Sequence, residues 1–465
     1  MPDVFFYNSL SRKREKFEPI EPGKVRLYTC GPTVYYYPQI GNWRTFVFED
    51  VLRRVLEYNS YEVRQVMNAT DVGHLTGDNV GNADVGEDRI EQEAKKEGKS
   101  VWDIADFYIQ DFRESLKLLN IEPATSFVRA TDNIPEQIRL VETLMTKGLA
   151  YVTETGVFFD VTKFPDYGKL GGQRLVDKRA LSRDELVEDK TKRQAADFAL
   201  WKFSVTQVKR QMEWESPWGV GFPGWHLECS AMAMKYLGET LDIHTGGVDH
   251  IAIHHTNEIA QSEGVTGKLF ARYWLHGEFL LIDGGRMGKS LGNAYSLHDI
   301  IKKGYDPRAL RYFYLNAHYR TKMNFTFSAL QAAQKALNKL YDLVGNGEEG
   351  KIGGGEFEES FLSAVNDDLD MPKSLRIVWD LVKSDYPLSA KKASLLKFDR
   401  VLGLGLKDHV SQTLVISDKV SNLLKAREVA REVSDFGLSD KIREEIESLG
   451  FMVEDSSHGT KLRQK

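Results

Sequence analysis

The stretch of sequence that decides this fold is Trp225–Glu258, which reads WHLECSAMAMKYLGETLDIHTGGVDHIAIHHTNE. It contains Cys229, one of only two cysteines in the chain, and it ends in a run in which His254 and Glu258 stand four positions apart. If this run begins a helix, the imidazole and the carboxylate project from one face about one turn apart. Both side chains can then bind the same metal ion.

The other cysteine, Cys30, lies much earlier in the chain, in YTCGPTV. Two thiols, an imidazole and a carboxylate would form a mixed S₂NO zinc site, but only if the fold brings the two cysteines together. On spacing alone, the alternative of two buried cysteines beside an ordinary histidine stays open.

Length and composition limit the class of protein. A chain of 465 residues with 42% apolar and 28% charged residues predicts two or three soluble domains. No run of about 18 or more apolar residues occurs, and the N-terminus MPDVFFYNSL does not have the pattern of a secretory signal. Two cysteines fit a reducing compartment, so we expect a cytoplasmic protein. With a net charge of −6, any polyanion must be bound by local patches.

The N-terminal part predicts a strand–helix–strand unit. Residues Lys24–Cys30 and Glu62–Met67 have the composition of strands, and apolar residues recur at helical spacing between Trp43 and Tyr58. This unit implies a parallel sheet whose ligand-binding edge follows the first strand. Gly41, near the helix start, would let a phosphate approach the backbone N–H groups.

The middle of the chain predicts an insertion into this sheet, at about residues 118–220. The polar composition of Asp71–Lys99 predicts a loop, and Ser100 with Asp103 predicts the start of a helix whose apolar face includes Phe107. Residues Ala150–Asp160 predict a hairpin, and Gly168–Ala195 predict a mobile segment.

After Glu258 we expect another helix, a strand at 278–282 and the glycine-rich loop DGGRMGKSLGN. Its two cations, Arg286 and Lys289, and the hydroxyl of Ser290 suit a polyphosphate, although an ordinary solvated loop is an open alternative. The last third predicts helices at Phe327–Leu343, Ser360–Val382 and Ser421–Phe436. Its scattered basic residues fit RNA phosphates or simply a solvated helix surface.

Several strings together resemble the class I cysteinyl-tRNA synthetases over nearly the whole chain. They are CGPTVY, IGNWRTF, NATDV, PGWHLECSAM, HTGGVDH, HHTNEIAQSE, GRMGKSLGN and, near the C-terminus, SDKIREEIESLGFMVED. The resemblance implies an α/β fold with a Rossmann-type parallel-sheet catalytic domain that a connective insertion splits, then an α-helical bundle and a small anticodon-contacting region. The implied ranges are 1–117 and 221–325 for the two catalytic halves, 118–220 for the insertion, 326–435 for the bundle and 436–465 for the last region.

The resemblance also implies a cysteine site. It assigns one Zn²⁺ per chain to Cys30, Cys229, His254 and Glu258, and L-cysteine to Gly31, Thr70, Trp225 and Asp249. Zinc prefers a thiolate to a hydroxyl, so a metal site would separate cysteine from serine without a second, editing site.

ATP with Mg²⁺ is implied as the second substrate. The implied ATP-binding residues are Gln39, Ile40, Gly41, Asn42, Gly246, Gly247, Arg286, Met287, Gly288, Lys289 and Ser290. Among them Lys289 would stabilise the transferring phosphates, with Arg286, Gln39 and Asn42 assisting. Three positions depart from the family pattern: the His-Ile-Gly-His signature reads QIGN, Gly288 replaces a serine, and Leu462 replaces a tryptophan.

The activity that this resemblance implies is the ATP-dependent attachment of L-cysteine to tRNA(Cys) through a cysteinyl-adenylate. We expect a monomer with tRNA(Cys), cysteine and ATP as partners and no membrane. Two alternatives remain: a cysteine ligase that acts on an amino-sugar in the mycothiol pathway, and a catalytically degenerate paralogue that binds cysteine or RNA. The first lacks the C-terminal region that residues 436–465 resemble, and the second is motivated by Gln39 and Gly288.

Overall fold

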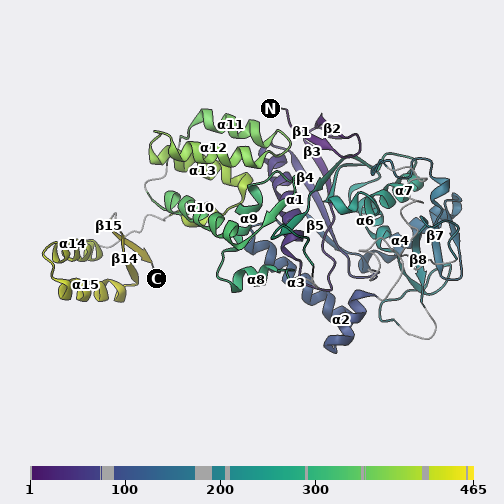
Figure 1. Cartoon of the computed structure of the whole chain (residues 1–465), viewed down its shortest axis with the longest axis horizontal. Coiled ribbons are helices and arrows are strands. Elements are labelled where there is room, and N and C mark those ends of the chain that lie inside the picture. The colour runs from purple at the N-terminus through teal and green to yellow at the C-terminus, as the bar shows by residue number, and fades with distance from the viewer. Residues whose placement is uncertain are drawn as a thin grey trace. The chain divides into compact units, whose positions relative to one another are not determined.

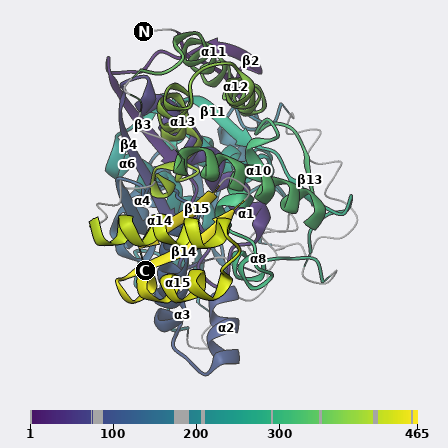
Figure 2. The same ribbon diagram turned by 90° about the vertical axis from the view of Figure 1, so that its left-hand side faces the viewer.

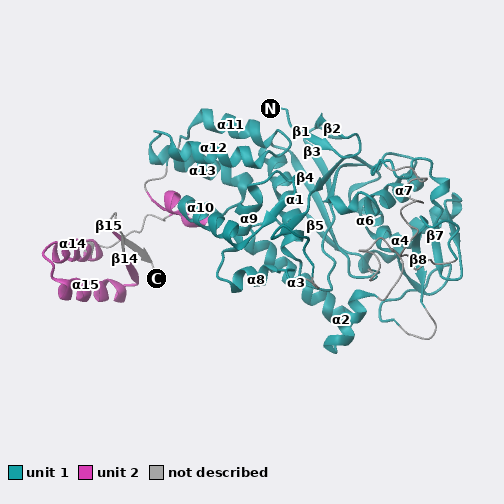
Figure 3. Ribbon diagram, viewed as in Figure 1, with its two compact units in different colours: residues 1–340, 348–406 teal, residues 341–347, 407–465 magenta. Residues whose placement is uncertain are grey.

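The computed structural model of the chain divides into two compact units (Figure 3), which are described separately. One unit comprises residues 1–340 and 348–406, and the other comprises residues 341–347 and 407–465. The structure describes residues 3–73, 75, 88–172, 191–204, 210–288, 292–346, 350, 352–410, 418–456 and 459–464.

The core of the first unit is a five-stranded parallel sheet of order β11-β10-β3-β4-β5. Figure 1 labels three of its strands, β3, β4 and β5. Its strands are β3 (Lys24–Thr29), β4 (Glu62–Ala69), β5 (Ser126–Arg129), β10 (Leu241–Gly247) and β11 (Ala271–Gly277). The strand order changes direction between β3 and β10, where Thr29 pairs with Thr245. In sheets of this kind, ligands bind beyond the carboxyl ends of the strands at this change of direction.

Six helices are described between β3 and β11. They are α1 (Ile40–Tyr58), α2 (Arg89–Glu97), α3 (Val101–Leu118), α4 (Ile134–Thr146), α6 (Trp225–Leu237) and α7 (His254–Thr266). Helix α1 packs against β4, β10 and β11, and α6 packs against β3 and β4. The predicted strand–helix–strand unit is confirmed, although the helix begins at Ile40 rather than Trp43.

Two local predictions in this region are wrong. The segment Asp71–Lys99 is not all loop, because α2 begins where the side chain of Asp88 accepts a hydrogen bond from the backbone of Ile90 (2.9 Å). Phe107 does not lie on the buried face of α3, since it is 45% exposed. Its neighbour Tyr108 is buried instead.

A second, antiparallel sheet of order β6-β7-β8-β9 lies between the two halves of the parallel sheet in sequence. Its strands are β6 (Ala150–Val152), β7 (Gly156–Phe159), β8 (Phe198–Phe203) and β9 (Gly221–Pro223), and it has its own apolar core. The predicted hairpin is confirmed as β6 and β7. Of the predicted mobile segment, residues 173–190 lie outside the described residues.

The rest of the first unit consists of two short strand pairs and further helices. The strands are β1 (Phe5–Asn8) with β2 (Lys13–Lys16), and β12 (Leu280–Ile282) with β13 (Met323–Phe325). The helices are α8 (Leu297–Lys302), α9 (Pro307–Leu315), α10 (Phe327–Gly345), α11 (Gly355–Val365), α12 (Met371–Lys383) and α13 (Leu388–Leu402), and the residues of α10 after Leu340 belong to the second unit. Short 3₁₀ helices occur at Thr131–Asn133, Val161–Lys163 and Val248–His250, and another at Leu406–His409, of which only Leu406 belongs to the first unit.

Helices α11, α12 and α13 pack against one another (Figures 1 and 2). The prediction of one continuous helix over Ser360–Val382 is wrong, because α11 ends at Val365 and α12 begins at Met371. Between them Asp368 and Leu369 have φ angles of +55° and +57°. Two consecutive left-handed residues end a right-handed helix.

The second unit contains α14 (Asp418–Glu432), α15 (Phe436–Ser448) and the hairpin of β14 (Phe451–Ser456) with β15 (Gly459–Gln464). The helix predicted at Ser421–Phe436 corresponds to α14, which ends at Glu432, whereas Phe436 is the first residue of α15. Leu462 pairs with Val453 through the backbone, and its side chain lies outside what the structure describes. No helix in the described part of either unit is long and apolar enough to span a membrane.

Candidate metal centre and adjoining cleft

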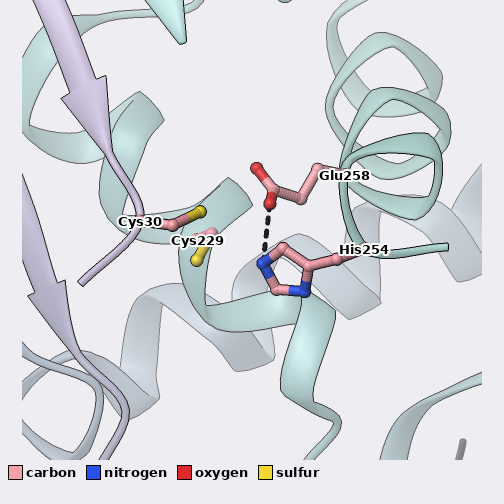
Figure 4. Close-up of side chains that lie close together, drawn as sticks. All are labelled: Cys30, Cys229, His254 and Glu258. Carbon is pink, nitrogen blue, oxygen red and sulfur yellow. Dashed lines mark ion pairs between the residues drawn. The ribbon is translucent and has the colours of Figure 1, made fainter. Parts of the chain in front are cut away.

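Four potential metal ligands meet beyond the carboxyl end of β3. Cys30 follows β3, Cys229 lies on α6, and His254 and Glu258 lie in the first turns of α7 (Figure 4). One ligand atom from each lies within 4.8 Å of the others, and all four residues are buried. Helix α7 begins at His254, which meets the condition that the sequence left open, so its imidazole and the carboxylate of Glu258 lie on one face. The helix expected after Glu258 is the continuation of α7 to Thr266. The fold thus brings the thiols of Cys30 and Cys229 close together, which their positions in the sequence could not establish.

The four residues influence one another's charge. A hydrogen bond with Cys30 lowers the pKa of Cys229 to about 6, while burial raises the pKa of Cys30 well above its usual range. Burial by itself lowers the pKa of His254, but the nearby carboxylate of Glu258 outweighs burial and raises that pKa to about 10. The buried cluster therefore favours one thiolate and one carboxylate beside a protonated imidazole, and a metal ion that binds there would replace the imidazole proton.

A second group of potential ligands overlaps the first. It consists of Cys30, His244, His255 and Glu258. In this group His244 Nε2 lies 2.7 Å from Glu258 Oε2, and His255 Nδ1 lies 2.8 Å from His276 Nε2. The sequence analysis missed these histidines, although HTGGVDHIAIHH is unusually rich in imidazole for a chain with 11 histidines.

A cleft of about 290 Å³ adjoins the first group of ligands. Of the metal-ligand candidates, Cys30, Cys229 and His254 line it. The same cleft is lined by eight of the residues expected to bind cysteine or ATP: Gly31, Gln39, Asn42, Thr70, Trp225, Gly246, Gly247 and Asp249. The second group of ligands shares only Cys30 with this lining. A molecule in the cleft can therefore reach the first group more directly.

At two positions of the cleft lining, neighbouring atoms lie so close that only glycine fits. A Cβ atom on Gly31 would lie 1.7 Å from the backbone oxygen of Asn68, whose side chain accepts a hydrogen bond from Gly31 N (2.9 Å). A Cβ atom on Gly246 would lie 2.6 Å from Nδ1 of His250, which also lines the cleft. Neither position accepts a side chain without a shift of its neighbours.

The QIGN motif forms the start of α1. The backbone N–H of Gln39 donates to Oδ1 of Asn42 (2.9 Å), so Nδ2 of Asn42 is the side-chain group that can donate into the cleft. Ile40 is fully buried, and its carbonyl accepts a hydrogen bond from the Tyr314 hydroxyl (2.6 Å). These bonds fix the motif where a helix N-terminus favours an anion.

The glycine-rich loop contacts this motif through Met287. Its Cε atom lies 2.7 Å from the position that a Cβ atom on Gly41 would take. Asn293 supports the loop, because its Oδ1 accepts from Gly288 N (2.9 Å) and its Nδ2 donates to the carbonyl of Arg286 (3.1 Å). Lys289 and Ser290, the other expected ATP-binding residues here, lie outside the described residues.

Comparison with known proteins assigns the chain to a family. A model described as "tRNA synthetases class I (C) catalytic domain" matches residues 16–335, and the "Cysteinyl-tRNA ligase anticodon binding domain" matches residues 415–463. The cysteine–tRNA ligase 1 of Burkholderia lata is 47% identical over 457 residues, which cover 98% of this chain and 96% of the relative. The chain belongs to the cysteinyl-tRNA synthetase family.

Another relative of this synthetase is the cysteine–tRNA ligase of Treponema denticola, which is 39% identical over 489 residues, or 98% of each chain. Among solved structures, methionyl-tRNA synthetase of Mycobacterium tuberculosis with methionyl-adenylate matches with a TM-score of 0.55. That match covers 83% of this chain and 91% of the other at 14% identity, so it concerns the fold alone. The predicted α/β class I fold and the C-terminal anticodon-binding domain are thereby confirmed.

A buried arginine connects the two signature segments of the synthetase. Arg44, on α1, donates to the carbonyl oxygens of Glu278 (2.8 Å) and Phe279 (2.6 Å), just before β12. It also donates to those of His318 (3.2 Å) and Thr321 (2.5 Å). Burial lowers the pKa of Arg44 to about 10. The helix that carries QIGN is thus bonded to the strand that leads into the glycine-rich loop.

Proposed function

We propose that this synthetase attaches L-cysteine to tRNA(Cys) through a cysteinyl-adenylate, and that Cys30, Cys229, His254 and Glu258 hold one Zn²⁺ ion. The observation that carries the proposal is the meeting of these four ligand atoms within 4.8 Å beside the cleft. Membership of the cysteinyl-tRNA synthetase family supports the ligation of cysteine to tRNA, with ATP as the energy source.

The donor set fits zinc. Two thiols, an imidazole and a carboxylate are groups that bind zinc in tetrahedral sites, and their burial excludes competing water. When bound, zinc would supply a Lewis acid that prefers a substrate thiolate to the hydroxyl of serine. Because Cys30, Cys229 and His254 line the cleft, a substrate side chain in the cleft can reach this centre.

The remaining polar groups suit the rest of the amino acid. Asp249 is exposed in the cleft, where its carboxylate can pair with the substrate ammonium. The ring centroids of Trp225 and His254 lie 4.6 Å apart, so the indole borders the metal centre and limits the size of the side chain. The Thr70 hydroxyl accepts a hydrogen bond from Asn68 (3.0 Å), and the Asn68 side chain accepts one from the backbone N–H of Gly31 (2.9 Å), so Asn68 holds both Thr70 and Gly31 in the cleft lining.

Activation requires the substrate carboxylate to attack the α-phosphorus of ATP in line and release pyrophosphate. We assign Gln39, Ile40, Gly41 and Asn42 to the phosphates, because they form the N-terminus of α1, and Gly246 and Gly247 to the ribose. Lys289 and Arg286, with Met287, Gly288 and Ser290, would neutralise charge that develops on the phosphates, which Mg²⁺ also binds. The terminal ribose hydroxyl of the tRNA then attacks the adenylate. Catalysis here is positioning and electrostatics, with no protein nucleophile.

We further propose the domain ranges 1–117, 118–220, 221–325, 326–435 and 436–465 for this architecture. A monomer suffices for activity, because the candidate ligands and the cleft come from one chain. The two cysteines are buried and unpaired, which supports a reducing, cytoplasmic location.

The deciding experiment supplies the purified protein with ATP, zinc, labelled cysteine and either tRNA(Cys) or the amino-sugar acceptor. We expect label on the tRNA alone, since residues 415–463 match an anticodon-binding domain. Transfer to the amino-sugar alone would identify the mycothiol-type ligase. Absence of cysteine-dependent pyrophosphate exchange would identify a degenerate paralogue. The exchange rate of Gln39→His, measured in parallel, shows how much the altered motif slows activation.

A further inference from the structure

A group of aromatic rings extends outward from the cleft. This aromatic surface consists of Tyr36 and Tyr37, in the segment between β3 and α1, and Phe107 and Tyr108 on α3. Ring centroids lie 5.1 Å apart for Tyr37 and Tyr108, 6.2 Å for Tyr37 and Phe107, and 6.3 Å for Tyr36 and Tyr108. Since Tyr36 and Tyr37 also line the cleft, the rings form a continuous path from the cleft onto α3.

Two of these rings face solvent although apolar side chains normally gain free energy by burial. Phe107 is 45% exposed and Tyr36 is 37% exposed, whereas Tyr108 beneath them is only 4% exposed. The exposed rings therefore rest on a fixed, buried ring, and they have little freedom to lose when a flat partner stacks on them. The apolar period of α3 alone would have buried Phe107, so its exposure needs a separate reason.

The charges near this surface are largely paired. Asp111 lies 2.6 Å from His298, Asp106 lies 2.6 Å from Arg129, and the carboxylate of Glu97 lies 2.8 Å from Lys99. The Lys99 Nζ atom is also 5.4 Å from the centre of the Phe107 ring. Two of these three acids therefore have a basic partner, Arg129 or Lys99, that offsets their charge toward a polyanion that approaches the rings.

We propose that the aromatic surface binds the unpaired bases at the 3′ end of the tRNA by stacking, and so guides the terminal ribose into the cleft. The inference rests on the proposed function, in which that ribose attacks the adenylate. The unpaired nucleotides must cross the rim of the cleft, and aromatic rings at a rim bind successive bases whatever their sequence.

The test compares Phe107→Ala and Tyr36→Ala with Trp102→Ala. Trp102 is 40% exposed and lies earlier on α3, at a helical position that faces another direction, so it is a matched control. We expect the KM for tRNA to rise about 5- to 100-fold for each of the first two variants, the range that loss of one stacked base gives. For Phe107→Ala, which lies outside the cleft lining, cysteine-dependent pyrophosphate exchange should stay within about 2-fold of the wild type, and Phe107→Tyr should keep the wild-type KM.

Equilibrium binding separates the 3′ end from the rest of the RNA. Intact tRNA(Cys) should bind the two alanine variants more weakly than the wild type, whereas tRNA that lacks its unpaired 3′ nucleotides should bind all the proteins equally. The inference would be overturned if the alanine variants lost equal affinity for intact and truncated tRNA. It would also be overturned if their KM for tRNA equalled that of Trp102→Ala.

Two further results would also overturn it. A parallel fall in pyrophosphate exchange for Phe107→Ala would mean that this ring acts on the cleft itself. Conversion of a wild-type dimer to a monomer by Phe107→Ala would mean that the rings join two copies of the chain. These outcomes differ from failure of the proposed function, which would show as a wild-type protein that cannot charge tRNA at all.

Discussion

The Nε2 atom of His254 lies 2.9 Å from the Oε1 atom of Glu258, one turn later on the same buried helix. The other oxygen of this carboxylate lies 2.7 Å from His244. The two α7 side chains are therefore held in place by protein contacts, with the ring nitrogen and the carboxylate already directed toward the two thiols. Such preorganisation reduces the entropy that a metal ion must offset on binding.

Replacement of Cys229 should remove the metal and the discrimination that depends on it. Cys229→Ala deletes a ligand found only in the first group of candidates, and His255→Asn deletes one found only in the second. We expect Cys229→Ala to lower bound zinc, measured by elemental mass spectrometry, and to narrow the preference for cysteine over serine in pyrophosphate exchange. His255→Asn should keep its zinc. The reverse pattern would assign the metal to the second group, and a zinc-free wild-type protein would contradict both.

The contact between Gly41 and Met287 should matter for the formation of adenylate. A methyl group on Gly41 would lie 2.7 Å from the Met287 Cε atom, so Gly41→Ala must displace the Met287 side chain from the start of α1. We expect at least a tenfold (about 1.4 kcal/mol) loss in pyrophosphate exchange, which Gly41→Ala with Met287→Ala should partly recover. Additive losses in the double variant would show that the two residues act independently.

Loss of Arg44 should destabilise the first unit. Arg44→Met removes one hydrogen bond from each of four carbonyl oxygens, and those of Phe279 and His318 still accept from backbone N–H groups (3.2 and 2.9 Å). Each group that is left unsatisfied costs about 1–3 kcal/mol before relaxation. We expect the free energy of unfolding in urea to fall by about 3–5 kcal/mol. The matched control is Arg139→Met, since Arg139 is 63% exposed and its change should be within about 0.5 kcal/mol. Similar values for the two variants would contradict this role.

Glu49 should make stability depend on pH. Burial raises its pKa to about 8, although the Thr245 hydroxyl donates a hydrogen bond to it (2.9 Å). The unfolded chain releases this proton near the ordinary value of 4.5, so the folded state binds more protons between these two values. The contribution of Glu49 to the free energy of unfolding is therefore full below pH 4.5. It is lost as the pH rises to about 8, by roughly 1.4 kcal/mol per pH unit.

Urea denaturation of the wild type and Glu49→Gln at several pH values tests this dependence. The amide does not titrate, so the wild type should lose stability relative to Glu49→Gln as the pH is raised through that window. A difference between the two proteins that stays constant with pH would mean that Glu49 is ionised in the folded state.

The sequence predicts the local parts of this molecule well and the long-range parts only through family resemblance. The spacing of His254 and Glu258 indicates a common face once a helix begins at His254, as α7 does. It cannot bring Cys30 to Cys229, because that contact depends on the order in which strands join the sheet. It also cannot show that His244 and His255 surround the same carboxylate.

The errors have physical causes of the same kind. Phe107 has an apolar side chain at a helical spacing, yet exposure depends on what covers the helix, and nothing local encodes that. Asp368 and Leu369 take left-handed conformations that neither residue prefers. Asp368 is held there by contacts from far away in sequence, among them a hydrogen bond from Tyr319 (2.7 Å). The domain ranges and the roles of the individual cleft residues stay predictions.

The position of β10 beside β3 also bears on how the polypeptide is made. Translation delivers β3 with its neighbour β4 early, while the partner for the other edge of β3 follows the whole antiparallel sheet. On the ribosome, the backbone groups along one edge of β3 therefore have no strand partner until residues Leu241–Gly247 emerge. Nascent chains that stall before that point carry an open sheet edge and a solitary Cys30, and chaperones would have to shield them from aggregation.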